Sequence, residues 1–170
     1  HRGQAPMNAN LLKDFSLIFA RELTTLRAEV LSYPDDASIW ALPAGAPNAG
    51  GTLVLHLCGN LRHFIGAGLG ASGYVRDRDA EFSTRGTSRA ELATLIHFAA
   101  AEVALALDAL PAERLDDTIQ IGPSTIPVRR GLLHLASHLA YHIGQLDYHR
   151  RLVTGDSRGV GAMGLPPQAD

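Results

Sequence analysis

Four long segments repeat apolar residues at the spacing of an α-helix, and this pattern limits what the chain can fold into. The segments cover about residues 10–33, 48–70, 88–110 and 129–153. Apolar residues three or four positions apart share one face of a helix and can pack against neighbouring helices. Ser88 and Glu91 have capping-box spacing at the start of the third segment, and Gly155 suits a C-cap after the fourth. The pattern predicts an all-α fold of the four-helix-bundle class.

The connection between the third and fourth helical segments favours a small amount of β-structure. Thr118–Ile121 and Thr125–Val128 are β-prone runs on either side of a Gly-Pro-Ser turn. They predict a small hairpin or a pair of extended arms. The linker at residues 71–87 is long and charged, and the connections differ in length. A simple up-down-up-down order of helices is therefore not assured.

The chain has 170 residues, which suits one domain, and we place this domain at residues 8–155. Hydrophobic residues make up 46% of the chain and charged residues 19%, which is a globular composition. Residues 1–7, with His1, are expected to be a disordered N-terminal extension or an expression remnant. Residues 156–170 are expected to form a C-terminal tail.

Charge and composition argue against several classes of function. Fifteen Lys and Arg residues stand against seventeen Asp and Glu residues, whereas a protein that coats nucleic acid is basic. No unbroken apolar run reaches the roughly 20 residues that span a bilayer, and the N-terminal residues lack the apolar core of a secretory signal. We therefore expect a cytoplasmic protein with no nucleic-acid or membrane partner. The single cysteine, Cys58, excludes a disulfide framework and is expected in the core rather than as a nucleophile.

Histidines are numerous for this length, and half of the eight lie in the fourth helical segment. His134, His138, His142 and His149 are spaced by four, four and seven residues, which places them on one stripe of a helix. Two imidazoles one turn apart can hold one metal ion. His138 and His142 lie on the shoulder of the apolar face, and His134 points further toward solvent. The pair His138 and His142 is therefore modestly favoured over His134 and His138.

The second helical segment carries a histidine at the same place relative to its own apolar face. His56 lies on the shoulder of the stripe that contains Leu53 and Leu57, and Asn60 follows one turn later. Where two such shoulders meet in a bundle, three imidazoles from two helices would form a half-open metal site. The alternative interpretation is that these histidines are hydrogen-bonded boundary residues, and spacing alone leaves both open.

Several residues near these histidines are candidates for supporting a bound ligand. Gln145 on the histidine stripe and Asn60 on the second helix can orient a ligand or water, or can form hydrogen bonds between helices. Tyr141 and Tyr148 can line a pocket, or can simply pack. Three other histidines are expected at the surface or behind the metal ligands: His63, His97 and His149.

The segment from Ser137 to Gln145 reads Ser-His-Leu-Ala-Tyr-His-Ile-Gly-Gln and resembles the fourth-helix signature of the DinB-like superfamily, which includes the YfiT-like proteins. That signature commonly reads Asn-His-x-x-x-His-Arg-Gly-Gln. Leu55-His56-Leu57 is similar to the Trp/Leu-His-Leu of the family's second helix, and residues 76–82 and 88–92 resemble its linker and the start of its third helix. Ser137 and Ile143 stand where the signature has Asn and Arg, outside the metal set.

The resemblance implies a four-helix bundle in which one histidine of the second helix and two of the fourth hold a divalent metal ion. Carried over residue by residue, these ligands are His56, His138 and His142. The resemblance further implies an enzyme in which zinc or nickel activates a low-molecular-weight thiol for S-transfer to a small-molecule substrate. Hydrolysis by activated water is the close competitor. Because members often dimerise, a homodimer is expected.

Two further hypotheses stay open beside this enzyme. The first is a metal-binding protein, stress-related or ligand-binding, without catalytic turnover. The second is a purely structural bundle whose histidines are satisfied by other protein groups. The position of three imidazoles relative to one another separates the last hypothesis from the other two.

Overall fold

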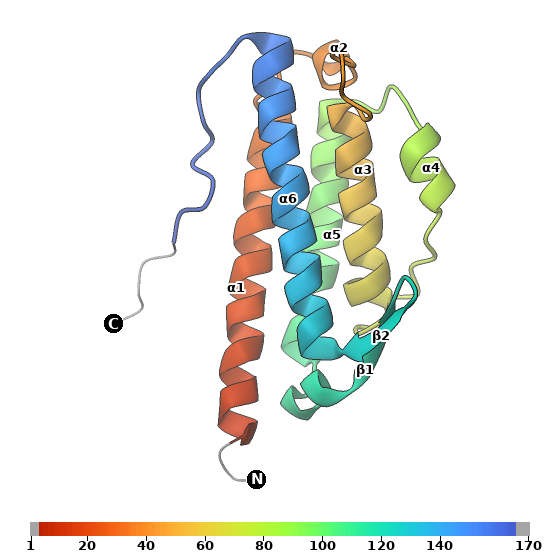
Figure 1. The fold of residues 1–170 in the computed structure, drawn as a ribbon, viewed down its shortest axis with the longest axis vertical. Coiled ribbons are helices and arrows are strands. Elements are labelled where there is room, and N and C mark those ends of the chain that lie inside the picture. Colours follow the sequence, from red (N-terminus) through yellow and green to blue (C-terminus); the bar gives the residue numbers. More distant parts are fainter. Residues whose placement is uncertain (1–3, 166–170) are drawn as a thin grey trace.

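The computed structural model describes residues 4–165 and shows a mostly helical chain with one small two-stranded sheet (Figure 1). Four long helices lie side by side: α1 (Gln4–Leu31), α3 (Gly50–Leu61), α5 (Arg89–Ala109) and α6 (Val128–Thr154). Helix α1 packs against α5 and α6, and α3 packs against the same two helices. The mostly helical structure supports the predicted all-α class.

Local signals explain where the long helices begin and end. At the start of α5, the Ser88 hydroxyl accepts a hydrogen bond from the Glu91 N–H and the Glu91 carboxylate accepts one from the Ser88 N–H, as the capping box predicts. Helix α6 ends at Gly155, whose φ of 70° lies in the left-handed region. Helix α1 already begins at Gln4. Pro6 is compatible with this start, because it falls in the first turn, where a missing N–H is tolerated.

Residues 4–7, assigned above to an extension, thus belong to α1. The expectation of disorder for His1 and the end of the predicted C-terminal tail concern residues 1–3 and 166–170, which lie outside the described part of the chain. Residues 156–165 follow α6 without helix or strand.

Shorter elements connect the long helices. Helix α2 (Asp36–Ile39) follows α1, a π-helical segment η1 (Arg62–Ala67) extends α3, and α4 (Arg78–Ser83) lies in the charged linker. A 3-10 turn η2 (Ala112–Asp116) leads into strands β1 (Thr118–Ile121) and β2 (Ser124–Pro127), which pair antiparallel. The predicted hairpin is confirmed, with its second strand one residue earlier than expected.

Helices α3 and α5 run in the same direction, because the linker between them returns the chain to the end of the molecule where α3 began (Figure 1). At this end the Arg89 N–H donates to Asp36 Oδ1 of α2 over 2.9 Å. Trp40 Nε1 donates to the Thr87 carbonyl over 2.8 Å, and Gly51 at the start of α3 lies against the Trp40 ring. The four long helices therefore do not follow a simple up-down-up-down order.

The core is built from the apolar stripes of the four long helices. Its largest fully buried apolar side chains include Phe15, Phe19, Leu26, Leu57, Leu61, Leu92 and Ile96. Among the described residues, α5 is the one helix long and apolar enough, by length and composition alone, to cross a membrane. Core helices that pack inside a protein pass the same test.

Candidate metal centre

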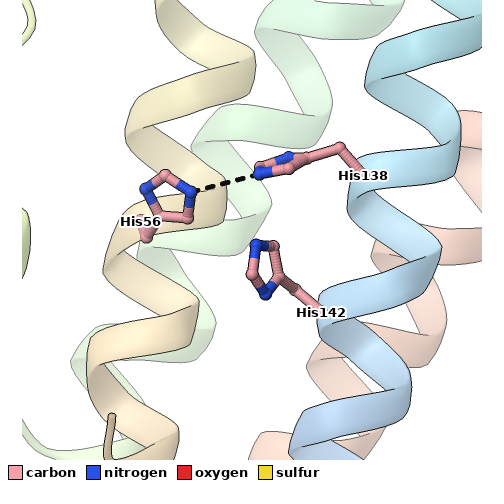
Figure 2. Close-up of side chains that lie close together, drawn as sticks. All are labelled: His56, His138 and His142. Atoms are coloured by element: carbon pink, nitrogen blue, oxygen red, sulfur yellow. Dashed lines mark hydrogen bonds between the residues drawn. The ribbon is translucent and has the colours of Figure 1, made fainter. Parts of the chain in front are cut away.

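Three histidines from two helices turn their rings toward one point (Figure 2). His56 lies on α3, and His138 and His142 lie one turn apart on α6. The Nε2 atoms of His56 and His138 are 3.2 Å apart. One ring nitrogen of each histidine lies within 4.8 Å of those of the other two. The three predicted ligands are therefore close enough to bind one metal ion.

The spacing and chemistry of this donor set fit a transition-metal ion. In a tetrahedral zinc site with bonds of about 2.0–2.1 Å, two ligating nitrogens lie about 3.4 Å apart, close to the His56–His138 separation of 3.2 Å. The rings of His138 and His142 are nearly perpendicular, at 86°, so their nitrogens converge without the rings stacking. Nδ1 of His138 is buried and has no hydrogen-bond partner among the described residues, so no protein group there fixes the tautomer of this ring, and its Nε2 is free to ligate an ion in place of its contact with His56.

Burial keeps two of these imidazoles in the form that binds metals. Burial, together with the neighbouring histidines, lowers the pKa of His138 to about 4. Burial also lowers the pKa of His56, although its hydrogen bond to Glu81 acts in the opposite direction. Metal ions bind the neutral imidazole. Both rings are therefore ready to ligate near neutral pH.

A carboxylate from the short helix α4 fixes the orientation of His56. Glu81 Oε2 is 3.1 Å from His56 Nδ1. Because a carboxylate only accepts, Nδ1 carries the proton and donates, which leaves the Nε2 lone pair facing the other two histidines. Arg76 holds the same carboxylate through two hydrogen bonds, from Nε to Oε1 over 2.6 Å and from Nη2 to Oε2 over 2.8 Å.

Glycine at position 59 lets α4 come close enough to α3 for this contact. A Cβ at Gly59 would lie 2.0 Å from Glu81 Oε1. Glu81 was not among the site residues predicted from the sequence. The signal for it was Asp77, whose side chain accepts from the Ala80 N–H and so begins the helix that carries Glu81.

Gln145 orients His142 as Glu81 orients His56. Its Oε1 lies 2.6 Å from His142 Nδ1, and because a carbonyl oxygen accepts, the ring donates from Nδ1 and keeps its Nε2 lone pair. Tyr141 packs edge-on against His142 and is 64% exposed. Asn60 is buried, its Oδ1 has no partner among the described residues, and no hydrogen bond recorded there joins it to the three histidines.

The remaining histidines of the described chain do not join the centre. His134 is exposed one turn before His138, and its ring stacks beside that of His138 with centroids 6.3 Å apart. His63 and His97 are exposed and contact the phenylalanine that follows each of them. The preference for His138 with His142, based on the helix faces, therefore agrees with the geometry.

His149 and Cys58 are buried structural residues. His149 was expected at the surface or behind the ligands, and this is corrected: Nδ1 lies 2.7 Å from the Tyr33 hydroxyl and Nε2 lies 2.8 Å from the Ala41 carbonyl. These two partners satisfy both ring nitrogens, which lets the ring enter the core. Cys58 is fully buried, as expected, and burial raises the pKa of its thiol to about 12.

Comparison with known proteins identifies a family without assigning an activity. No curated protein matches the chain, and no solved structure matches it. The model of a family described as "Protein of unknown function (DUF1572)" matches residues 10–160. The matched region includes the three histidines, Glu81 and Gln145. By this match over most of its length, the chain belongs to the DUF1572 family.

Proposed function

We propose that this protein is a metal-dependent enzyme of the DinB-like superfamily, a four-helix bundle in which His56, His138 and His142 hold one divalent ion, zinc or nickel. The observation that carries the proposal is the convergence of three imidazoles, two of them oriented by Glu81 and Gln145. Three protein ligands are typical of catalytic zinc sites, whereas structural sites have four. When bound, such an ion lowers the pKa of a coordinated water or thiol toward neutrality.

The reaction that we favour is transfer of a low-molecular-weight thiol to a small electrophile. A thiol RSH and an acceptor R′–X give RS–R′ and HX. The sulfur–carbon bond forms while the carbon–X bond breaks, X leaves with the bonding electron pair, and the thiol proton ends on X. Residues 137–145 support this choice by their resemblance to the superfamily's fourth-helix signature. Hydrolysis, with water in place of the thiol, would use the same three histidines.

The protein's own contribution is to keep the ligands aligned and neutral. Glu81 and Gln145 hold the Nδ1 protons of His56 and His142, so both rings keep their Nε2 lone pairs toward the centre. Burial disfavours the imidazolium form of His138, so this ring does not lose its lone pair to a proton near neutral pH.

Elemental analysis tests the metal site. Protein made in medium with zinc or nickel and purified without chelator is expected to hold about one ion per chain. His138→Ala and His142→Ala are expected to lose the ion. His134→Ala is the matched control, because His134 is an exposed histidine one turn from His138 on the same helix. A metal-free wild type, or equal loss in the control, would contradict the proposal.

Turnover tests the chemistry. Metal-loaded protein is incubated with a panel of small thiols and neutral electrophiles such as chlorodinitrobenzene, and the conjugates are measured against the His138→Ala protein. Metal-dependent conjugate formation is expected. If the protein instead hydrolyses esters without consuming thiol, it is a hydrolase and not a thiol transferase. Metal binding without any turnover would identify a binding protein.

A further inference from the structure

A cavity of about 380 Å³ opens beside the candidate metal centre, between α6 and the loop at residues 43–48 that leads into α3. His142 and Gln145 line one end of it, and Tyr148 and Leu152 continue its wall along α6. We propose that this cavity binds the organic part of the substrate and selects uncharged aromatic or apolar molecules. The inference rests on the proposed metal-dependent function, whose acceptor substrate it specifies.

The described residues that line the cavity offer no oppositely charged side chain to a charged substrate. None of them is Lys, Arg, Asp or Glu. Burial lowers the pKa of His149, which also lines the cavity, so this ring is neutral near pH 7. A carboxylate or phosphate that entered would lose hydration without gaining a cation. Neutral molecules are therefore favoured.

Aromatic and proline side chains shape the walls. Tyr141 and Tyr148 on α6 are 64% and 69% exposed, and Leu152 is 71% exposed. Grouped exposed side chains of this size are typical of binding surfaces rather than of bare protein surface. Pro43 and Pro47 lie in the opposite wall and restrict the backbone of the loop. A flat aromatic molecule could pack against these side chains.

Two polar side chains, His142 and Gln145, line the end of the cavity that adjoins the metal centre. His142 belongs to both, because its ring lines the cavity and one of its nitrogens lies in the cluster with His56 and His138. Gln145 accepts from His142 through Oε1, and no hydrogen bond recorded in the described chain uses its amide nitrogen. That nitrogen can donate to a carbonyl, nitro or ester oxygen. A molecule in the cavity would thus turn its polar end toward His142.

Binding of nitrobenzene and of benzoate tests this selection, because the two probes share a ring and differ in charge. Both are titrated by ligand-observed NMR into the metal-loaded wild type and into His138→Ala. The variant lacks one proposed metal ligand, so a carboxylate cannot bind there by ligating the ion. Nitrobenzene is expected to bind both proteins. Benzoate is expected to bind the His138→Ala protein at least about tenfold more weakly than nitrobenzene binds it.

Two cavity variants and one control locate the binding. Tyr148→Ala removes part of a wall and Ala46→Phe fills the cavity, and each is expected to weaken nitrobenzene binding about tenfold. Leu133→Ala is the control, since Leu133 is 56% exposed on the same helix and lies outside the cavity lining. Benzoate binding as tight as nitrobenzene binding in His138→Ala, or unchanged nitrobenzene binding in both cavity variants, would overturn the inference.

The experiments distinguish a failure of the cavity inference from a failure of the proposed metal-dependent function. If the wild type holds no metal but the probes bind as expected, the proposed function fails and the neutral binding cavity remains. If the metal binds but the probes do not distinguish the cavity variants from the control, the substrate class is wrong and the metal site remains.

Discussion

Glu81 Oε2 lies 3.1 Å from His56 Nδ1, and the same carboxylate accepts two hydrogen bonds from Arg76. Glu81 on the linker helix α4 thus orients the imidazole of His56 on α3, so that its Nε2 lone pair faces the other two histidines. The candidate centre therefore depends on the linker as well as on the two long helices that carry the histidines. Groups behind metal ligands typically change metal affinity by about 10–100-fold when they are replaced.

Glu81→Gln is expected to weaken metal binding by about 10–100-fold, because the amide is a poorer acceptor for the His56 Nδ1 proton. Affinity is measured by competition with a chromophoric chelator. Circular dichroism and thermal unfolding are recorded in parallel, because Arg76 also loses its charged partner. Glu113→Gln is the matched control, an exposed glutamate on η2. Unchanged affinity in a folded Glu81→Gln protein would show that the carboxylate does not orient the ligand.

Gln145→Ala is expected to weaken metal binding about tenfold, because His142 loses the acceptor that fixes its ring. Gln145 is exposed, so the free energy of unfolding should change by less than about 0.5 kcal/mol. Gln145→Glu keeps an acceptor oxygen at this place and should restore most of the affinity. Affinity is measured by the same competition assay. Equal loss of metal affinity in Gln145→Ala and Gln145→Glu would show that the Gln145 oxygen does not orient His142.

His149 is expected to make the metal-free protein less stable in acid. Burial lowers the pKa of His149 from its ordinary 6.5, so the unfolded chain binds a proton at a pH where the folded protein does not. The free energy of unfolding therefore falls as the pH drops below the unfolded-state pKa, by up to about 1.4 kcal/mol per pH unit for this group, until the folded-state pKa is reached.

Urea unfolding in the presence of chelator at about pH 7.5 and about pH 5.5 measures this dependence. His149→Asn is expected to lower stability at the higher pH, since the partners Tyr33 and Ala41 lose the ring. It should also reduce the difference in stability between the two pH values. A variant with the full pH dependence of the wild type would exclude His149 as a source of acid sensitivity.

A buried ion pair joins α1 to α6, and breaking it is expected to be costly. Arg150 Nε lies 2.6 Å from Glu29 Oε2, and both side chains are 1% exposed. Glu29→Gln leaves the buried guanidinium with Asp147 as its remaining carboxylate, so the free energy of unfolding should fall by about 3 kcal/mol. Asp117→Asn breaks the exposed pair with Arg114 and should cost about 1 kcal/mol or less. The free energies of unfolding are measured in urea, and similar losses in Glu29→Gln and Asp117→Asn would contradict the expected difference.

The four long helices and the His138–His142 pair could be predicted because both depend on local geometry. A helix places residues four positions apart on one face whatever surrounds it, and the capping residues Ser88 and Gly155 mark helix ends by their own backbone contacts. The shared position of the histidines beside apolar stripes allowed His56 to meet this face, and the resemblance to the DinB-like signature implied that it does. Glu81 escaped prediction because α4 is a helix of only six residues in a charged linker.

Helical periodicity was enough to predict the four long helices, their apolar faces and which histidines can share a face, because these properties repeat with every turn. Three features became visible only in the folded protein: α3 and α5 run in the same direction, Gly59 admits the Glu81 carboxylate beside His56, and His149 is buried. These features depend on contacts between residues far apart in the chain, and no local periodicity encodes which distant segments meet.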